Sequence, residues 1–193
     1  MDKVAENQKK DNWLRLLRNG DQQAFVRLID KYKEMVFLCC RRLGLREDEI
    51  EDVASETFLA AYKGLNKYAG QSDLSTWLWG IAYRKAVSYL RKNRKNWQLE
   101  DELDEQISDS RSQEPAAEMQ AEETEKIVWQ AVERLPQLWA MAIILYYREQ
   151  KCIFDIAKIM GQNENTIKTY LFRARARLKE MLAATFGAED ADR

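Results

Sequence analysis

The chain has 193 residues, enough for one medium or two small domains, and its 31 basic and 32 acidic residues leave a formal net charge of −1. It contains no histidine, which excludes imidazole bases, Ser–His and Cys–His nucleophile pairs, and histidine metal ligands. Only seven glycines and two prolines are present, so a largely helical protein with short connections is predicted.

The N-terminal residues MDKVAENQKKDN do not form a signal peptide, and no apolar run approaches the length of a membrane span. None of the three cysteines has CxxC spacing, and Cys39 and Cys40 fall where a helix would bury small apolar residues. We therefore interpret them as core residues. A protein of the reducing cytoplasm, without a metal or a cofactor, is expected.

The N-terminal half predicts three helices. Residues 13–18 form a short helix that Asn19 and Gly20 interrupt, and Asp21 is a suitable N-cap for a longer helix that ends before Gly44. The next helix runs from about 47 to 65, with acidic first turns that suit the positive helix end. Its predicted core positions are Ile50, Val53, Ala54, Thr57, Phe58, Ala61 and Leu65.

A polar loop at 66–75 leads into the stretch DLSTWLWGIAYRKAVSYLRKNRKN (73–96), where Ser72 or Ser75 is expected to cap the helix. On a helical wheel the packing face is formed by Leu78, Trp79, Ala82, Tyr83, Ala86 and Leu90. The opposite face carries Arg84, Lys85, Ser88, Lys92 and Lys95, together with Trp77 and Ile81. No acidic residue follows Asp73 until Glu100, whereas soluble helix surfaces usually mix charges. This face therefore indicates a polyanionic partner rather than an ordinary solvated surface.

Residues 98–123 are acidic and polar, and they predict a linker between helical domains at 1–97 and 124–193. An alternative use for the linker is to shield the basic patches when DNA is absent. Further helices are predicted before Pro136 and at 138–147, 151–161 and 163–186. No strand alternation appears, so the predicted fold class is all-α, with two small helical domains.

The last two predicted helices have the pattern of a helix-turn-helix. Ala157 is small where the helices cross, Gly161 suits a turn with positive φ, and Ile167 supplies the apolar contact between the helices. Asn163 and Asn165 are both suitable N-caps for the second helix. Its inward residues are predicted to be Ile167, Leu171, Ala174 and Leu178.

The outer face of this second helix carries basic, hydroxyl and aromatic side chains: Asn165, Thr169, Phe172 and Arg173, flanked by Thr166, Lys168, Arg175 and Arg177. An exposed phenylalanine in this setting suits a thymine methyl group, and arginine suits guanine or phosphate. The alternative is a surface helix with a stray aromatic residue, because helix-turn-helix patterns produce false positives. The pattern favours DNA binding.

Together these segments resemble a bacterial RNA polymerase sigma factor of the extracytoplasmic-function (ECF) group. The matching segments are 20–32, 51–62 (EDVASETFLAAY), 73–92, 135–136 and 153–179. The resemblance implies domains σ2 (1–97) and σ4 (124–193) and a non-enzymatic factor that directs promoter recognition, −10 melting and transcription initiation at a stress or envelope regulon. The implied partners are core RNA polymerase (its β′ clamp helices and β flap), promoter DNA and an anti-sigma factor.

The resemblance also implies residue roles. Asp52, Glu56 and Phe58 match the helix that docks on the β′ clamp. The loop from Tyr68 through Ser72 to Ser75 matches the segment that captures a flipped base of the −10 element. Along the following helix, −10 contacts are implied or expected for Trp77, Arg84, Lys85, Ser88, Arg91 and Lys92. The −35 surface is matched by Lys168, Thr169, Phe172 and Arg173, with Thr166 beside them and Arg175 as a phosphate contact.

The sequence departs from the family pattern at a few positions. Ser55 stands where glutamine is usual, and Gln150-Lys151-Cys152 replaces the usual Gly-Leu-Ser. The stretch WAMAIILYY (139–147), within the expected β-flap grip at about 138–147, is unusually apolar.

Two rival functions remain open at this point. One is an ordinary helix-turn-helix regulator that binds an operator as a dimer. The other is a nucleic-acid-processing enzyme, but the sequence has no GxxxxGK loop, metal-ligand cluster or nucleophile–base pair. A metal role for Asp52 and Glu56 is the weakest of these interpretations.

Overall fold

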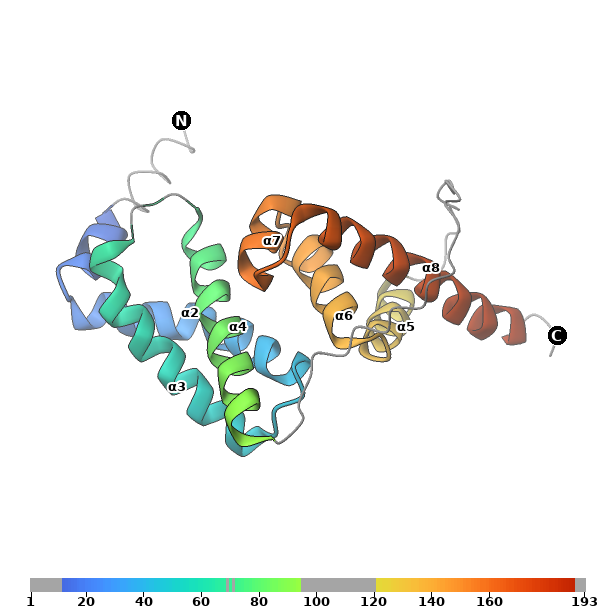
Figure 1. The fold of residues 1–193 in the computed structure, drawn as a ribbon, viewed down its shortest axis with the longest axis horizontal. Helices are drawn as coiled ribbons and strands as arrows, with labels where there is room; N and C mark the ends of the chain where they lie inside the picture. The colour runs from blue at the N-terminus through green and yellow to red at the C-terminus, as the bar shows by residue number, and fades with distance from the viewer. Residues whose placement is uncertain (1–11, 69, 71, 95–120, 190–193) are drawn as a thin grey trace. The chain divides into compact units, whose positions relative to one another are not determined.

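The computed structural model describes residues 12–68, 70, 72–94 and 121–189, and every regular element in these ranges is a helix. The chain divides into two compact units, Met1–Trp97 and Gln98–Arg193, which are taken separately below (Figure 1). The predicted all-α fold class is confirmed. None of the described helices is long and apolar enough to span a membrane.

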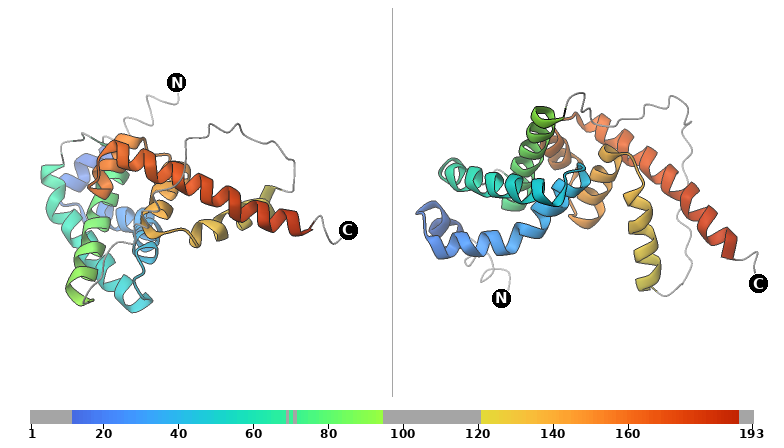
Figure 2. Two further views of the ribbon diagram at one scale, coloured as in Figure 1. Left: turned by 45° about the vertical axis from the view of Figure 1, so that its right-hand side comes forward. Right: turned by 90° about the horizontal axis from the view of Figure 1, so that it is seen from below.

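The first unit is built on three long helices. Residues 12–18 are helical, and they are followed by α2 (Gln22–Arg42), α3 (Glu47–Gly64), the 3₁₀ turn η1 (Leu65–Lys67) and α4 (Leu74–Asn93). Each of α2, α3 and α4 packs against the other two (Figure 2). As predicted, Asp21 caps α2 by accepting a 2.7 Å hydrogen bond from the Ala24 N–H, and Gly44 follows the helix with φ of +81°.

The core of this unit forms where the apolar stripes of the three helices meet. All seven core positions predicted for the 47–65 helix are buried, six in α3 and the last in η1: Ile50, Val53, Ala54, Thr57, Phe58, Ala61 and Leu65. Thr57 satisfies its hydroxyl inside the core by donating a 2.8 Å bond to the Val53 carbonyl. Burial of each large apolar side chain contributes about 1.5–3 kcal/mol, so this stripe holds α3 in place between its neighbours.

A buried carboxylate joins the start of α3 to the end of α4. Glu49 is 5% exposed; it accepts a 2.8 Å bond from the Arg46 N–H and a 2.8 Å bond from Nη2 of Arg94. The first bond closes the N-terminus of α3, and the second fixes the residue that follows α4. The basic helix is therefore anchored at its C-terminal end.

The predicted caps of α4 are wrong. The N-cap residue is Asp73, and its side chain makes no capping hydrogen bond, while Ser75 lies in the first turn and Ser72 precedes the cap. Neither serine can cap the helix, because the N-cap position falls at Asp73, one residue after Ser72 and two before Ser75.

The second unit contains α5 (Ala121–Glu133), α6 (Gln137–Ile143), the π-helical turn η2 (Ile144–Arg148), α7 (Ile153–Met160) and α8 (Glu164–Glu189). α5, α6 and α7 all contact α8. The helix-turn-helix is formed by α7 and α8, with Gly161 at φ +66° in the turn and Asn163 accepting a 2.7 Å bond from the Thr166 N–H. Most of the predicted linker, 98–123, lies outside the described residues, and its last residues, 121–123, belong to α5.

The apolar segment predicted as one helix at 138–147 changes its winding. α6 ends at Ile143, and the π-helical turn follows, in which the Glu149 N–H donates a 3.0 Å bond to the Ile144 carbonyl. The chain then leaves the helix through Gln150, which has φ of +51°. The wider turn brings Tyr146 and Tyr147 to the surface beside α8, where Arg175 contacts both.

Candidate nucleic-acid interface

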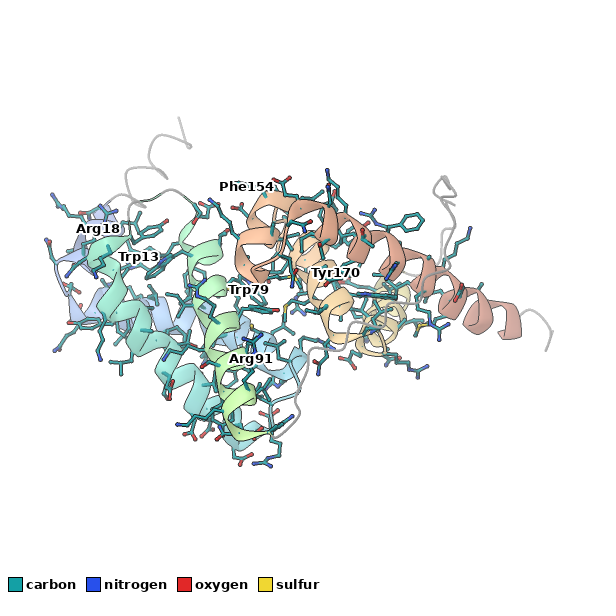
Figure 3. The ribbon with its side chains drawn as sticks, viewed as in Figure 1. Trp13, Arg18, Trp79, Arg91, Phe154 and Tyr170 are labelled. Atoms are coloured by element: carbon teal, nitrogen blue, oxygen red, sulfur yellow. The ribbon has the colours of Figure 1, made fainter. Side chains whose placement is uncertain are left out.

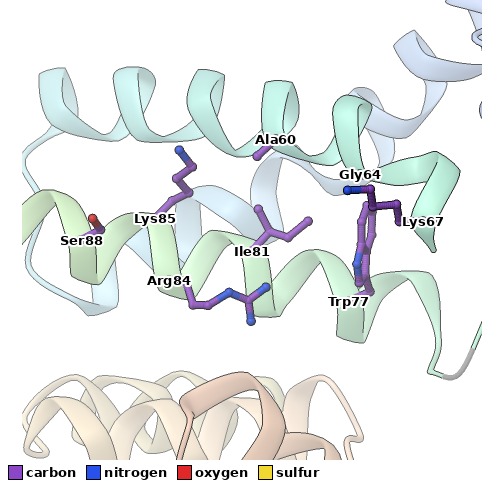
Figure 4. Close-up of a pocket in the computed structure, with 8 residues that line it drawn as sticks. All are labelled: Ala60, Gly64, Lys67, Trp77, Ile81, Arg84, Lys85 and Ser88. Carbon is purple, nitrogen blue, oxygen red and sulfur yellow. The ribbon is translucent and has the colours of Figure 1, made fainter. Parts of the chain in front are cut away.

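A groove of about 540 Å³ lies between α3 and α4 (Figure 4). Its lining residues are Ala60, Gly64, Lys67, Trp77, Ile81, Arg84, Lys85 and Ser88. The structure thus brings together much of the predicted cationic face of α4. It adds Gly64 and Lys67 from the opposite side, which the helical wheel of α4 alone does not reveal. A groove with an indole wall and cationic edges suits a nucleotide, since a base can stack on the ring and phosphates can meet the charges.

The charged residues of α4 are accessible to a ligand. Arg84, Ser88, Arg91 and Lys92 are exposed, and Lys85 is half-buried. Lys85 Nζ lies 3.0 Å from a carboxylate oxygen of Glu56, in a solvent-exposed pair that contributes little to stability. This pair links the cationic face of α4 to the acidic face of α3.

The two tryptophans of α4 lie on different sides of the helix. Trp79 is 0% exposed and belongs to the core (Figure 3), whereas Trp77 is half-buried and lines the groove (Figure 4). The Trp77 ring lies against α3 at Gly64, where a Cβ atom would come within 3.1 Å of it. Ile81, placed by the wheel among the charged residues, is buried instead because α3 covers that side of the helix.

Tyr68 occupies an interior position at the start of the loop. It is 7% exposed, its ring centroid lies 5.1 Å from that of Trp77, and its hydroxyl donates to the Ser72 carbonyl. Its predicted DNA contact is therefore not available to the ring in this conformation. Ser72 and Ser75 are half-buried, and residues 69 and 71 of the loop lie outside the described residues. Tyr68 holds the loop rather than presenting itself at the surface.

The exposed face of α3 is acidic and apolar. Asp52 and Glu56 are exposed, whereas Phe58 is 7% exposed and packs in the core, as its predicted core position requires. Its clamp contact stays a prediction. The exposed apolar residue is its neighbour Leu59, at 53%. At the spacing of an α-helix, positions 52, 56 and 59 lie on one face and position 58 lies on the opposite face. The exposure of Leu59 and the burial of Phe58 therefore follow from helical geometry.

The outer face of α8 is less uniformly exposed than expected. Lys168 and Thr169 are exposed, whereas Thr166, Phe172 and Arg173 are half-buried. Among the described residues, Nη1 of Arg173 is enclosed and has no hydrogen-bond partner. A shallow depression of about 590 Å³ covers the start of α8 and is lined by Asn163, Glu164, Asn165, Thr166, Lys168 and Thr169. The first turns of a recognition helix are where base contacts are made.

Arg175 is held by two tyrosines of the π-helical turn. Its Nε donates a 2.8 Å hydrogen bond to the Tyr147 hydroxyl, and its guanidinium carbon lies 5.5 Å from the ring centroids of both Tyr146 and Tyr147. The sequence did not reveal this contact, because it joins positions 28 residues apart through a turn that periodicity does not predict. Neutral tyrosines orient the arginine and leave its charge available for an anion.

The cysteine pair has a structural role. Cys39 and Cys40 are buried in α2, and burial raises the pKa of Cys40 to about 12 and that of Cys39 well above its usual value. Such thiols are poor metal ligands and poor nucleophiles. Within the described ranges, no cluster of three or more Cys, Asp or Glu side chains is arranged to hold a metal ion.

Comparisons with known proteins match both units. Family models match residues 28–96 (sigma-70 region 2) and 125–178 (sigma-70 region 4). The chain is 30% identical over 186 residues to the ECF RNA polymerase sigma-E factor of Haemophilus influenzae, covering 93% of this chain and 98% of that protein. It is 26% identical over 178 residues to the ECF RNA polymerase sigma factor SigW of Bacillus subtilis, covering 88% and 94%.

A solved structure is also similar. It is the sigma factor RpoE in complex with the anti-sigma factor NepR from Bartonella quintana, with a TM-score of 0.57 and 26% identity. The match covers 82% of this chain and 96% of that one.

Proposed function

This chain belongs to the ECF group of the sigma-70 family, and from that premise we propose that its first unit reads the −10 element and its second unit the −35 element. The chain is a promoter-directing sigma factor whose partner is core RNA polymerase. The proposed domains are σ2 (1–97) and σ4 (124–193), with 98–123 as the linker. In this mechanism the chain catalyses no covalent step.

The groove between α3 and α4 is the proposed site for the melted −10 strand. Trp77 offers a stacking surface worth about 1–3 kcal/mol per base, which offsets the few kcal/mol lost when a base leaves the duplex. The phosphates of this strand meet the cationic and hydroxyl side chains along α4, namely Arg84, Lys85, Ser88, Arg91 and Lys92. Lys67 joins them from the α3 side of the groove.

The outer face of α8 is the proposed reader of the −35 major groove. Lys168 and Thr169 contact base edges near its N-terminus, with Phe172 and Arg173 one turn further along and Thr166 at the margin. Arg175, oriented by Tyr147, contacts a backbone phosphate. Phosphate contacts supply affinity on any sequence, and base contacts supply the choice of promoter.

Docking on the β′ clamp is proposed for the exposed face of α3. Asp52 and Glu56 pair with basic side chains of the clamp, and the exposed Leu59 adds an apolar contact beside the one predicted for Phe58. An exposed leucine beside carboxylates suits a partner with mixed apolar and basic character. Since core polymerase works on the chromosome, the proposed site of action is the cytoplasm.

An anti-sigma factor is a further proposed partner. The similar sigma factor from Bartonella quintana was solved with such a protein bound. A factor of this kind would keep the present chain from the polymerase until it is released.

The observation that carries the proposal is the groove, which combines a half-buried indole with cations on a helix that has no acidic residue after its N-cap. DNA binding by the protein alone and by its complex with core polymerase tests it. The sigma assignment predicts tight promoter binding and permanganate-reactive −10 thymines only when core enzyme is present. A rival helix-turn-helix regulator would instead bind its operator tightly as an isolated dimer.

A further inference from the structure

Arg18 reaches from the N-terminal helical segment to the loop that precedes α4. Its Nη2 donates a 2.7 Å hydrogen bond to the Tyr68 carbonyl, across 50 positions of the chain. Its guanidinium carbon lies 6.0 Å from the Tyr68 ring centroid, so one side chain contacts both the backbone and the ring of that residue. A hydrogen bond from a charged donor is stronger than one between neutral groups.

Tyr68, which Arg18 holds in place, in turn contacts two parts of the proposed −10 site: the loop before α4 and the Trp77 ring. Its hydroxyl donates to the Ser72 carbonyl, which ties together the two ends of the 68–72 loop segment. Its ring packs on Trp77 at a centroid distance of 5.1 Å and an interplanar angle of 41°. On the α3 side of the indole lies Gly64, where a Cβ would be 3.1 Å away. Trp77 is thus held between a tyrosine and a glycine.

The restraint comes from outside the groove. Arg18 does not line the groove, whereas Trp77 does, and the family models match the chain only from residue 28 onward. Arg18 lies outside both matched regions. Its contacts nevertheless make it the first member of a continuous series, Arg18–Tyr68–Trp77.

We infer that Arg18 is a positioning residue for promoter opening, acting through Tyr68 on the loop and on the Trp77 indole without touching DNA itself. The inference rests on the proposed function of the groove. Its physical basis is preorganisation: an indole already held in place pays no ordering cost when the flipped base arrives. Loss of Arg18 frees the start of the loop and lets Tyr68 and Trp77 move.

The test compares Arg18→Ala, Arg18→Lys and the control Arg15→Ala in holoenzyme on duplex promoter DNA, with open-complex formation followed by permanganate reactivity. Arg15 lies on the same helical segment, and its side chain donates a 3.0 Å hydrogen bond to Asn12 rather than to the loop. Arg15→Ala therefore removes the same charge as Arg18→Ala without removing a contact to Tyr68. Arg18→Ala is expected to lower opening by about tenfold, the loss typical of a charge-assisted hydrogen bond. Arg18→Lys restores part of it, and Arg15→Ala behaves as the parent protein.

A double-mutant cycle separates positioning from a direct phosphate contact. In a Trp77→Ala background, Arg18→Ala should cause clearly less than its single-mutant loss, because both changes act on the same series of contacts. The salt dependence of DNA binding should also keep its slope, whereas a lost phosphate contact lowers the slope by about one. Full additivity, or a reduced slope, overturns the inference.

The possible failures are distinguishable. If the parent holoenzyme opens no promoter, the proposed function itself fails. If the parent opens promoters and Arg18→Ala does so equally well, only the positioning role fails. A defect of Arg18→Ala that appears already in assembly with core polymerase, or as global unfolding by circular dichroism, shows a merely structural role and also overturns it.

Discussion

At the scale of single residues, Gln150 adopts a backbone conformation that favours glycine. Its φ is +51° and its side chain is exposed, so little side-chain packing is at stake. A non-glycine residue in this region carries a cost of about 1–2 kcal/mol, partly offset by the greater freedom of glycine in the unfolded chain. We expect Gln150→Gly to raise the free energy of unfolding by about 0.5–1 kcal/mol, measured by urea denaturation.

The matched control for that substitution is Gln150→Ala. It removes the same side chain but keeps the Cβ atom that makes positive φ costly. A stabilisation shared by both variants would contradict the backbone explanation.

The three thiols are expected to differ in reactivity because Cys39 and Cys40 are buried and Cys152 is exposed. Burial raises the pKa of Cys40 to about 12 and that of Cys39 well above its usual range, so both remain protonated near pH 8. Since the thiolate is the reacting form, a thiol reagent at that pH should label only the exposed Cys152 in the folded protein. Cys152→Ser should abolish rapid labelling, and a rapidly reacting second thiol would contradict the buried placement.

At the scale of the helix, α4 carries one tryptophan in the core and a second that is proposed to contact DNA. Trp79 is fully buried, so Trp79→Ala is expected to destabilise the first unit by about 3–5 kcal/mol. Trp77 lies half-buried in the groove, so Trp77→Ala should leave holoenzyme assembly intact and reduce open-complex formation. Urea denaturation and permanganate reactivity measure the two effects. Unfolding by Trp77→Ala but not by Trp79→Ala would reverse the assignment of the two faces.

On α8, two arginines are expected to play different parts. Arg173→Ala should weaken −35-dependent promoter binding by about 1–3 kcal/mol and relax the sequence preference there. Arg175→Ala should weaken binding to all promoters alike and reduce the salt slope by about one. Competition binding of holoenzyme to promoters with altered −35 elements measures both. An unchanged −35 preference in Arg173→Ala would remove that residue from the recognition surface.

Helical periodicity was enough to predict much of the fold. It identified the core stripe of α3, the Asp21 cap and the Gly161 turn, because each depends on local spacing or on the backbone preference of one residue. It also separated Trp77 from Trp79.

The sequence did not reveal features that depend on distant contacts. The burial of Tyr68 depends on Arg18 and Trp77, and the π-helical turn that brings Tyr147 to Arg175 has no periodic pattern. The Phe58 assignment came from matching positions to a family. An exposed apolar residue on that helix is Leu59, one position away.

At the scale of the whole molecule, basic and acidic residues are concentrated in different segments of the chain. A net charge of −1 coexists with a basic helix in the first unit, a basic helix in the second and an acidic stretch at 100–126. Each unit has its own core and carries one of the two proposed DNA-binding surfaces. The acidic face of α3, where Asp52 and Glu56 are exposed, repels DNA. Useful promoter affinity is therefore expected only when core polymerase covers that face.

Run-off transcription with purified core polymerase on a library of promoter sequences tests this central claim most directly. The account predicts that adding the protein yields discrete transcripts from a subset of promoters sharing −10 and −35 elements, and that core enzyme alone yields none of them. An absence of stimulation on every template, with tight operator binding by the protein alone, would contradict it.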